Sequence, residues 1–178
     1  MRIRQVLPTI RQYPNCKVLD VGCGWDYRLL RTIEPYISSG TGVDFKVPEL
    51  INGKISTHQI MLDSKLPFTE GYFDVVTMLA VLEHLSNPLG IVKEIERVLT
   101  RKGRLVLTVP SKLSRPVLEF LSYKLKIVNE DEIRDHKKYY DYTELKNLFA
   151  QTSLTIERHK YFQLGMNNFC VILKDTGN

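Results

Sequence analysis

The sequence predicts an α/β fold built on a mostly parallel, doubly wound sheet. Buried-strand patterns alternate with helical patterns along the chain, as in strand-helix-strand units. The first strand, over residues 17–21, runs directly into Gly22 and Gly24, which let the main chain turn tightly. Asp44 follows 20 residues after Gly24. This separation of a glycine turn and an acid is typical of a nucleotide site at a sheet edge.

Five strands are expected in the first two thirds of the chain, over residues 17–21, 40–43, 56–60, 73–78 and 104–109. A helical pattern over residues 27–36 separates the first two. The connection after Asp44 is short, so we expect only a turn near residues 48–52. The clearest helix spans residues 88–99, because Asn87 can cap it and Pro88 suits its first turn. Gly103 then ends the turn before the next strand.

The pattern changes after the fifth strand. Prolines punctuate the chain at positions 110 and 116, and a helix is expected over residues 143–150. Two final strands, over residues 154–161 and 168–174, close the chain. Only 16 residues precede the first strand, so we expect residues 111–142 to cover the substrate site. The whole chain, residues 1–178, is expected to form a single domain.

Composition agrees with one domain, since 43% of the 178 residues are hydrophobic and 25% are charged. No apolar run approaches the ~20 residues of a membrane span, and the N-terminus has no signal-peptide core, which favours a cytoplasmic protein. Cys16, Cys23 and Cys170 lack disulfide or zinc spacing, so we expect free thiols and no metal site. Cys23 is interpreted as a compact filler of the glycine turn.

The charge is unevenly distributed. Residues 1–89 contain nine basic and nine acidic residues, whereas residues 90–178 contain 16 and 11, so the whole excess of +5 lies in the second half. This favours an anionic acceptor or surface on that side. An ordinary solvated face, on which Lys and Arg alternate with Glu, is the alternative.

The glycine turn differs from a dinucleotide-binding turn, because Trp25, Asp26 and Tyr27 stand where a third glycine would be needed. Asp26 would also repel a phosphate at the following helix. These residues favour an adenosine ligand without a pyrophosphate. An NAD-dependent oxidoreductase is the alternative by fold, but a sulfonium cation tolerates the nearby Asp20 better.

The segment Val-Leu-Asp-Val-Gly-Cys-Gly, residues 18–24, resembles the first motif of class I S-adenosylmethionine-dependent methyltransferases of the small-molecule type. Later segments of the same family match in order, at residues 42–44, 62–68 and 73–85. The resemblance covers about residues 17–109. It implies a Rossmann-like, seven-stranded sheet with the order 3-2-1-4-5-7-6 and a C-terminal antiparallel hairpin.

The resemblance also implies S-adenosyl-L-methionine as the cofactor. In this family Gly22 and Gly24 would line its methionine part, Asp20 would hold its ammonium group directly or through water, and Asp44 would bind the ribose. Asp26 departs from the family, since many members have glycine there.

At the adenine end, the resemblance implies that Asp63 accepts a hydrogen bond from the amino group. Leu62 and Phe45 would offer apolar surface to the ring. The main chain of Leu79 and Ala80 would pass beneath the methionine end.

Two histidines are candidate catalytic residues. His84 follows the fourth strand, at the edge where ligands bind in open α/β sheets, and Glu83 stands beside it. His136 belongs to a stretch that resembles the family's His-x-x-x-Tyr-x-x-x-x-Leu pattern. As alternatives, His84 and Glu83 brace the helix that begins near Asn87, and His136 lies in a surface loop. Few obligatory catalytic residues are expected, because positioning provides most of the catalysis of methyl transfer.

We therefore expect a methyltransferase that acts on a small molecule, a sugar or a lipid-linked intermediate by direct in-line transfer. An RNA methyltransferase is an alternative, although no Asn/Asp-Pro-Pro-Tyr motif follows the fourth strand and no RNA-binding domain is appended. Nucleic acid is therefore not expected as a partner. The third alternative is a non-catalytic cofactor-binding module, because Asp26 stands in the glycine turn where many family members have glycine.

Overall fold

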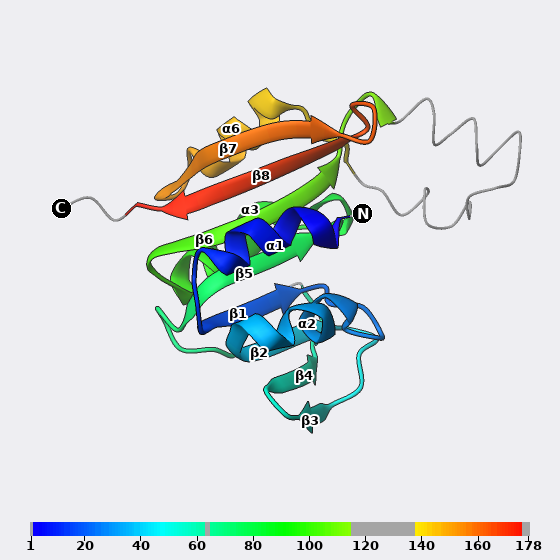
Figure 1. Ribbon diagram of the computed structural model, residues 1–178. Helices are drawn as coiled ribbons and strands as arrows, with labels where there is room; N and C mark the ends of the chain where they lie inside the picture. The colour runs from blue at the N-terminus through cyan, green and yellow to red at the C-terminus, as the bar shows by residue number, and fades with distance from the viewer. Residues whose placement is uncertain (1, 63–64, 115–137, 176–178) are drawn as a thin grey trace, which may run out of the picture.

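The computed structural model describes residues 2–62, 65–114 and 138–175, in which helices cover both faces of one mixed sheet (Figure 1). The strands follow the order β3-β4-β2-β1-β5-β6-β8-β7. Their bounds are Cys16–Val21 (β1), Ile37–Asp44 (β2), Leu50–Asn52 (β3), Ile55–Gln59 (β4), Phe73–Leu79 (β5), Leu99–Pro110 (β6), Leu154–Phe162 (β7) and Asn167–Lys174 (β8). Strands β1, β2, β4, β5 and β6 are parallel, so their carboxyl ends meet at one edge, here called the carboxyl edge.

The predicted strand order is confirmed, because the seven expected strands correspond to β4-β2-β1-β5-β6-β8-β7. The predicted strand number was wrong by one. Residues 48–52 were expected to form only a turn, but Leu50–Asn52 pairs antiparallel with β4. The hairpin forms because Gly53, with φ +58°, permits a tight turn, and because the Thr57 hydroxyl donates to the Pro48 carbonyl at 2.5 Å.

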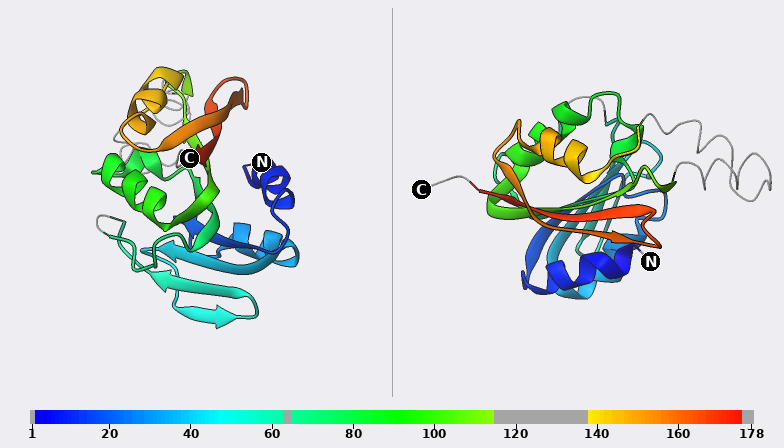
Figure 2. Two further views of the ribbon diagram at one scale, coloured as in Figure 1. Left: turned by 90° about the vertical axis from the view of Figure 1, so that its left-hand side faces the viewer. Right: turned by 90° about the horizontal axis from the view of Figure 1, so that it is seen from above.

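Helices cover both faces of the sheet (Figure 2). Their bounds are Ile3–Arg11 (α1), Arg28–Ile33 (α2), Pro88–Val98 (α3) and Tyr142–Phe149 (α6), with 3₁₀ turns at Glu34–Tyr36 (η1) and Leu82–His84 (η2). Asn87 caps α3 as predicted, since its side chain accepts from the Gly90 N–H at 3.0 Å. Helix α1 was not anticipated from the sequence.

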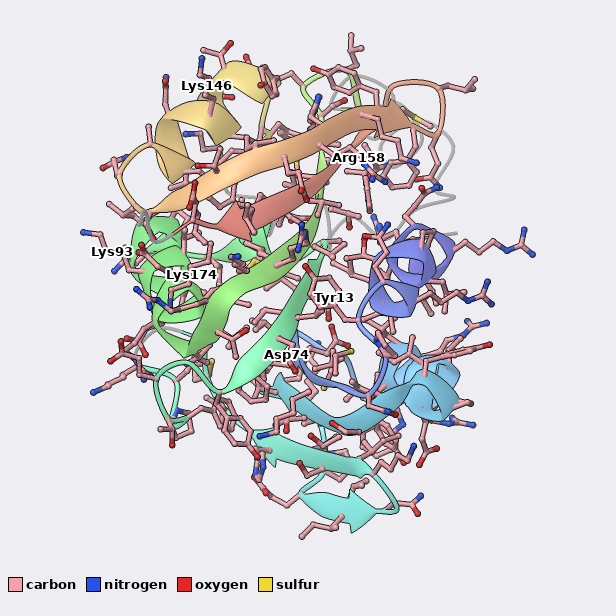
Figure 3. The ribbon with its side chains drawn as sticks, turned by 60° about the vertical axis from the view of Figure 1, so that its left-hand side comes forward. Tyr13, Asp74, Lys93, Lys146, Arg158 and Lys174 are labelled. Carbon is pink, nitrogen blue, oxygen red and sulfur yellow. The ribbon has the colours of Figure 1, made fainter. Side chains whose placement is uncertain are left out.

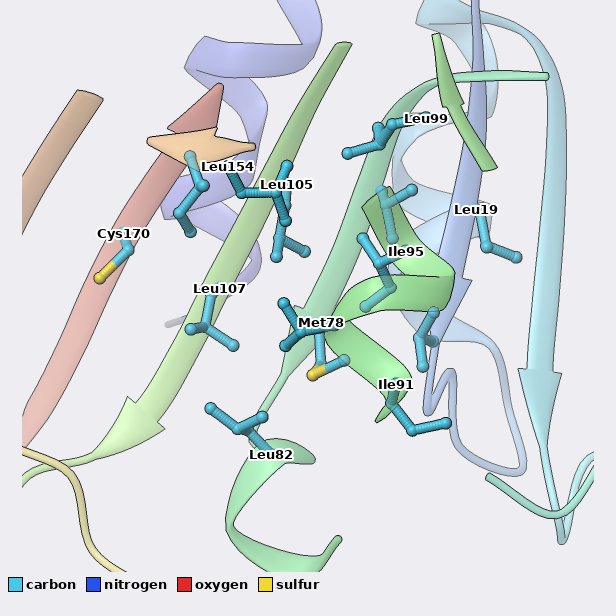
Figure 4. Close-up of a cluster of buried hydrophobic side chains, with 14 of the residues drawn as sticks. Leu19, Met78, Leu82, Ile91, Ile95, Leu99, Leu105, Leu107, Leu154 and Cys170 are labelled. Carbon is cyan, nitrogen blue, oxygen red and sulfur yellow. The ribbon is translucent and has the colours of Figure 1, made fainter. Parts of the chain in front are cut away.

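The core lies on both faces of the sheet, as a doubly wound fold requires. Successive β6 residues alternate: Leu105 and Leu107 pack beneath α3 and α6, whereas Val106 packs beneath α1 and α2. Figure 4 shows part of the first cluster, where Met78 and Ile95 are fully buried. The sheet is therefore held in place from both sides.

The amino ends of the strands are fixed by polar contacts. Asp74 accepts from the Lys17 N–H at 2.9 Å, which joins the start of β1 to β5. Strand β6 begins earlier than predicted, at Leu99, so Gly103 lies within the strand, where the register with β5 is interrupted before Arg104. The Lys174 ammonium donates to the Leu99 carbonyl at 2.7 Å. Ligands of open α/β sheets bind at the opposite, carboxyl edge.

Charged side chains of the second half are spread over several elements. Figure 3 shows Lys93 on α3, Lys146 on α6 and Arg158 on β7, all exposed. Other basic residues are paired, as in the Arg104–Glu157 contact at 2.8 Å. This distribution is typical of a solvated surface.

The predicted substrate cover, residues 111–142, is described only at its ends. The Ser111 N–H donates to the Met166 carbonyl at 2.9 Å, and the Tyr140 N–H donates to the Pro110 carbonyl at 3.2 Å. Residues 115–137, including His136, lie outside the described residues. Within the described ranges, no helix has the length and apolar character needed to cross a membrane.

Candidate cofactor and active site

The turn after β1 is tied to the end of β2. The N–H groups of Gly22 and Cys23 donate to the Val43 carbonyl at 2.8 and 3.2 Å. Gly22 has φ +74°, and a Cβ there would collide with the Val81 side chain, which follows β5. The backbone conformation and a neighbouring strand end therefore both exclude a side chain at Gly22.

Gly24 differs from Gly22 in its surroundings. Its φ of +71° also favours glycine, but nothing lies within 4 Å of the position that a Cβ would take. The sequence predicts either a conformation or a contact that excludes a Cβ, and the structure shows the conformation. The open side of Gly24 leaves room for a ligand against the main chain.

Asp44 holds the glycine turn and the end of β2 together. One carboxylate oxygen accepts from the Gly24 N–H and the other from the Lys46 N–H, both at 2.9 Å. Its side chain is largely buried. Each oxygen retains lone-pair capacity for a further donor, since an ionised carboxylate has about four acceptor sites. The carboxylate is thus fixed in position before any ligand binds.

Asp20 is a buried acid in the middle of the sheet. Its side chain is 3% exposed and accepts from the Thr77 hydroxyl at 2.6 Å, across the β1–β5 pair. Burial raises the pKa of Asp20 to about 7, the Thr77 hydrogen bond lowers it, and the Asp44 charge raises it further. A cation placed beside Asp20 would relieve this cost. Thr77 was not singled out from the sequence, although a hydroxyl inside an apolar strand was a visible signal.

The end of β5 has an unusual backbone. Ala80 has φ +60°, a conformation that a residue with a side chain adopts only at a cost. Its N–H donates to the Thr108 carbonyl at 2.8 Å, which holds the strained residue against β6. The preceding Leu79 is partly buried. Together with the close approach of the Val81 side chain to Gly22, this places the ends of β1 and β5 side by side.

The predicted adenine side is described in part. Phe45 is 50% exposed, and its carbonyl accepts from the Gln59 side-chain amide at 2.9 Å. Leu62 is partly buried and packs on the core. Asp63 lies outside the described residues, so its predicted contact with adenine stays a prediction.

His84 lies in η2, directly beyond the strained end of β5. It is partly buried, and its N–H donates to the Val81 carbonyl at 2.9 Å. Its predicted partner His136 lies outside the described residues, so the structure does not test their convergence. Cys23 is buried in the glycine turn, where its sulfur would lie 2.8 Å from a Cβ at Gly42, in agreement with the expected filler role.

Glu83 is the residue whose environment the sequence did not reveal. It is 1% exposed, and burial raises its pKa to about 7, while its own backbone N–H and the Arg2 charge lower it. The side-chain cap of α3 is provided by Asn87, so capping of this helix does not account for the burial of Glu83. Strongly perturbed acids concentrate at functional sites.

Sequence comparison finds relatives among methyltransferases. Residues 2–159 match the model of a family described as a methyltransferase domain. The ubiquinone biosynthesis O-methyltransferase of Vibrio parahaemolyticus serotype O3:K6 is 27% identical over 172 residues, covering 87% of this chain and 70% of the relative. The tRNA U34 carboxymethyltransferase of Nautilia profundicola is 33% identical over 101 residues, covering 52% of this chain and 34% of the relative.

Structure comparison agrees on the fold. A crystal structure of a SAM-dependent methyltransferase from Aquifex aeolicus superposes with a TM-score of 0.69 and 14% identity, covering 96% of this chain and 88% of that chain. At this identity the match concerns the arrangement of the strands and helices.

The two glycines should respond differently to the same substitution. Gly22→Ala introduces a clash with Val81 in addition to backbone strain, so we expect loss of cofactor binding and a lower Tm. Gly24→Ala adds only the cost of a positive φ, about 1–2 kcal/mol, and should leave the fold intact. Calorimetric titration with S-adenosylhomocysteine and thermal melts measure both effects. Equal losses of Tm and of cofactor affinity in the two variants would contradict the geometry of the turn.

Asp20 should make both stability and cofactor binding depend on pH. Its folded pKa is raised, so the unliganded fold loses stability as pH rises from about 4 to about 7. Asp20→Asn should raise the Tm above pH 7 by several degrees, at about 2–4 °C per kcal/mol, and change it little near pH 4. The pH dependence due to Glu83 should remain.

Cofactor binding provides the second readout for Asp20. If an ammonium group binds beside it, Asp20 must ionise, so binding near pH 6.5 should release up to about one proton in the wild type. Asp20→Asn should release none from this site. Titrations in buffers of different ionisation enthalpy measure the release, and identical values for the two proteins would rule out this role.

Proposed function

We propose a site and an acceptor class for this chain, which belongs to the class I S-adenosylmethionine-dependent methyltransferases and takes S-adenosylmethionine as its methyl donor. The observation that carries the site is the Asp44 carboxylate clamp on the glycine turn. The proposed cofactor residues are Asp20, Gly22, Gly24, Asp44, Phe45, Leu62, Asp63, Leu79 and Ala80.

The described residues suit the chemistry of this cofactor. Asp44 presents a fixed carboxylate, which supports its role as acceptor for ribose hydroxyls. Asp20 is a buried acid that favours a cationic partner, as the ammonium group of a methionine moiety would be. The open side of Gly24 allows close approach to the main chain. No phosphate-binding group is required in this arrangement.

In the proposed mechanism, the main role of the protein is to hold the methyl donor and the acceptor in the geometry that the transfer requires. The bound cofactor supplies an activated methyl group and a good leaving group. The strained Ala80, held by the Thr108 carbonyl, fixes the main chain beneath the methionine end. His84, in the 3₁₀ turn η2 that follows Ala80, accepts the proton of the acceptor where one must be lost. His136 and residues 111–142 are proposed to complete the acceptor site and cover it.

The proposed acceptor is a small molecule, a sugar or a lipid-linked intermediate. The Vibrio parahaemolyticus relative, a ubiquinone biosynthesis O-methyltransferase, supports this because it aligns with 87% of the chain. RNA is the second candidate, supported by the tRNA U34 carboxymethyltransferase relative, which aligns with only 52%. The segment after β5, residues 80–84, lacks the Asn/Asp-Pro-Pro-Tyr motif, so we favour the first candidate.

Cofactor selectivity tests the site directly. The protein should bind S-adenosylmethionine and S-adenosylhomocysteine but not NAD in calorimetric titrations. Asp44→Ala should weaken binding by about 1.5–3 kcal/mol, the usual scale for a hydrogen bond to a charged group. Glu34→Ala, at the opposite end of β2, is the control and should leave affinity unchanged. NAD binding, or an unaffected Asp44→Ala protein, would remove the basis for the ribose assignment.

His84→Ala tests the proton-accepting role. It should lower turnover about ten- to a thousandfold while cofactor affinity changes little, as for other proton-transfer residues. The assay measures S-adenosylhomocysteine release with the acceptor that the wild type methylates fastest from a panel of phenols, sugars and tRNA transcripts. Full activity of His84→Ala would show that His84 accepts no proton and that catalysis depends on positioning alone. If the wild type methylates tRNA fastest, RNA would replace a small molecule as the proposed acceptor.

A further inference from the structure

Three buried polar atoms have no hydrogen-bond partner in the described part of the chain. They are one carboxylate oxygen of Glu83 (Oε2), the hydroxyl of Thr108 (Oγ1) and the amide oxygen of Asn167 (Oδ1). Leaving such a group buried and unsatisfied costs about 1–3 kcal/mol, and more when it is charged. Each therefore requires an explanation, of which a bound ligand is one.

Two of the three atoms belong to neighbouring positions on one face of the sheet. Thr108 lies opposite Phe169, and Asn167 lies opposite Pro110, two residues along the same β6–β8 pair. Directly opposed residues of an antiparallel pair share a face, so Thr108 and Asn167 are diagonal neighbours, with Cα atoms about 7–8 Å apart. Phe169, on the same face, packs in the cluster of α1 and α2.

Glu83 belongs to the same end of the sheet. It lies in η2, three residues after Ala80, whose N–H donates to the Thr108 carbonyl, and η2 contacts β6. The charge of Arg2, just before α1, lowers the pKa of Glu83, and Glu83 in turn helps to raise the pKa of Tyr140 to about 12. Glu83 is thus near the start of α1 and near Tyr140, at the C-terminal end of the predicted substrate cover.

The chemistry of these atoms selects the ligand. An ionised carboxylate oxygen and an amide oxygen only accept hydrogen bonds, whereas the threonine hydroxyl donates or accepts. The amide nitrogen of Asn167 is already used, since it donates to the Gln163 side chain at 2.8 Å. A ligand that satisfies all three must donate hydrogen bonds, and an anionic group would be repelled by Glu83.

We propose that Glu83, Thr108 and Asn167, here called the polar cluster, form the acceptor site and bind the hydroxyl groups of a neutral methyl acceptor. This inference rests on the proposed function and names its substrate class. The polar cluster lies beyond Ala80, so a hydroxyl held there stands next to the methionine end of the cofactor site. A neutral acceptor takes the place of the anionic acceptor that the excess of basic residues in the second half of the chain favours.

Matched probes test the inference without knowledge of the natural acceptor. The protein is saturated with S-adenosylhomocysteine and titrated at about pH 8, above the pKa of Glu83, with two pairs of small molecules. Each pair compares a neutral hydroxyl compound with a carboxylate: catechol with salicylate, and methyl β-D-glucopyranoside with the corresponding glucuronide. Ligand-observed NMR gives the dissociation constants. We expect at least one neutral member to bind at least fivefold more tightly than its carboxylate partner.

Variants assign the preference to the polar cluster. Glu83→Gln should weaken the preferred probe about 10- to 100-fold, the range for a hydrogen bond to a charged group, and Thr108→Val about 2- to 10-fold. Neither should lower the Tm, because Glu83→Gln removes a buried ionisable group and Thr108→Val removes an unsatisfied hydroxyl. Glu94→Gln is the matched control: Glu94 pairs with Arg97 at 2.8 Å, so its loss should lower the Tm and leave probe binding unchanged.

Two results would overturn the inference: no preference for the neutral member of either pair, or a preference that Glu83→Gln leaves intact. A drop in Tm for Glu83→Gln as large as that for Glu94→Gln would likewise assign Glu83 a structural role. Failure of the proposed function is distinguishable, because the protein would then not bind S-adenosylhomocysteine in the first step.

Discussion

The Asp44 carboxylate is the contact on which the geometry of the carboxyl edge depends. It accepts from the Gly24 and Lys46 N–H groups, while the Val43 carbonyl beside it accepts from Gly22 and Cys23. These contacts join the ends of β1 and β2, residues 22–24 and 43–46, into one rigid unit, here called the Asp44 corner. Because its donors are main-chain N–H groups, the corner needs glycines at positive φ together with the Asp44 carboxylate that accepts from Gly24.

The same edge holds two acids at a cost in stability. Asp20 and Glu83 are almost fully buried, and burial raises the pKa of each to about 7. Replacing either by a neutral residue of similar shape would relieve this cost in the unliganded fold. Such conflicts between stability and function are expected where a protein binds charged or polar groups. Asp20 lies beside the proposed methionine end of the cofactor site, and Glu83 belongs to the proposed acceptor site.

Local sequence was enough to predict the parallel part of the sheet and the glycine turn after β1. The apolar runs of β1, β5 and β6 identify strands covered on both faces, and the glycine pair, followed 20 residues later by Asp44, marks the turn. The contacts of these residues with a cofactor stay a prediction. What spacing could not predict was β3, because a strand of three residues is too short to show an alternating pattern, even though it pairs with β4 across a tight turn. The unsatisfied atoms of Thr108 and Asn167 were equally invisible, since they arise from the antiparallel register of β6 and β8.

A crystal structure of the protein with bound S-adenosylhomocysteine tests the central claim most directly, namely that the Asp44 corner is built to hold a nucleoside. The account predicts ribose hydroxyls within hydrogen-bond distance of the Asp44 carboxylate, which keeps its bonds to the Gly24 and Lys46 N–H groups. It also predicts the ammonium group beside Asp20. A nucleoside bound elsewhere, or an Asp44 carboxylate that must leave the glycine turn to reach the ribose, would contradict it.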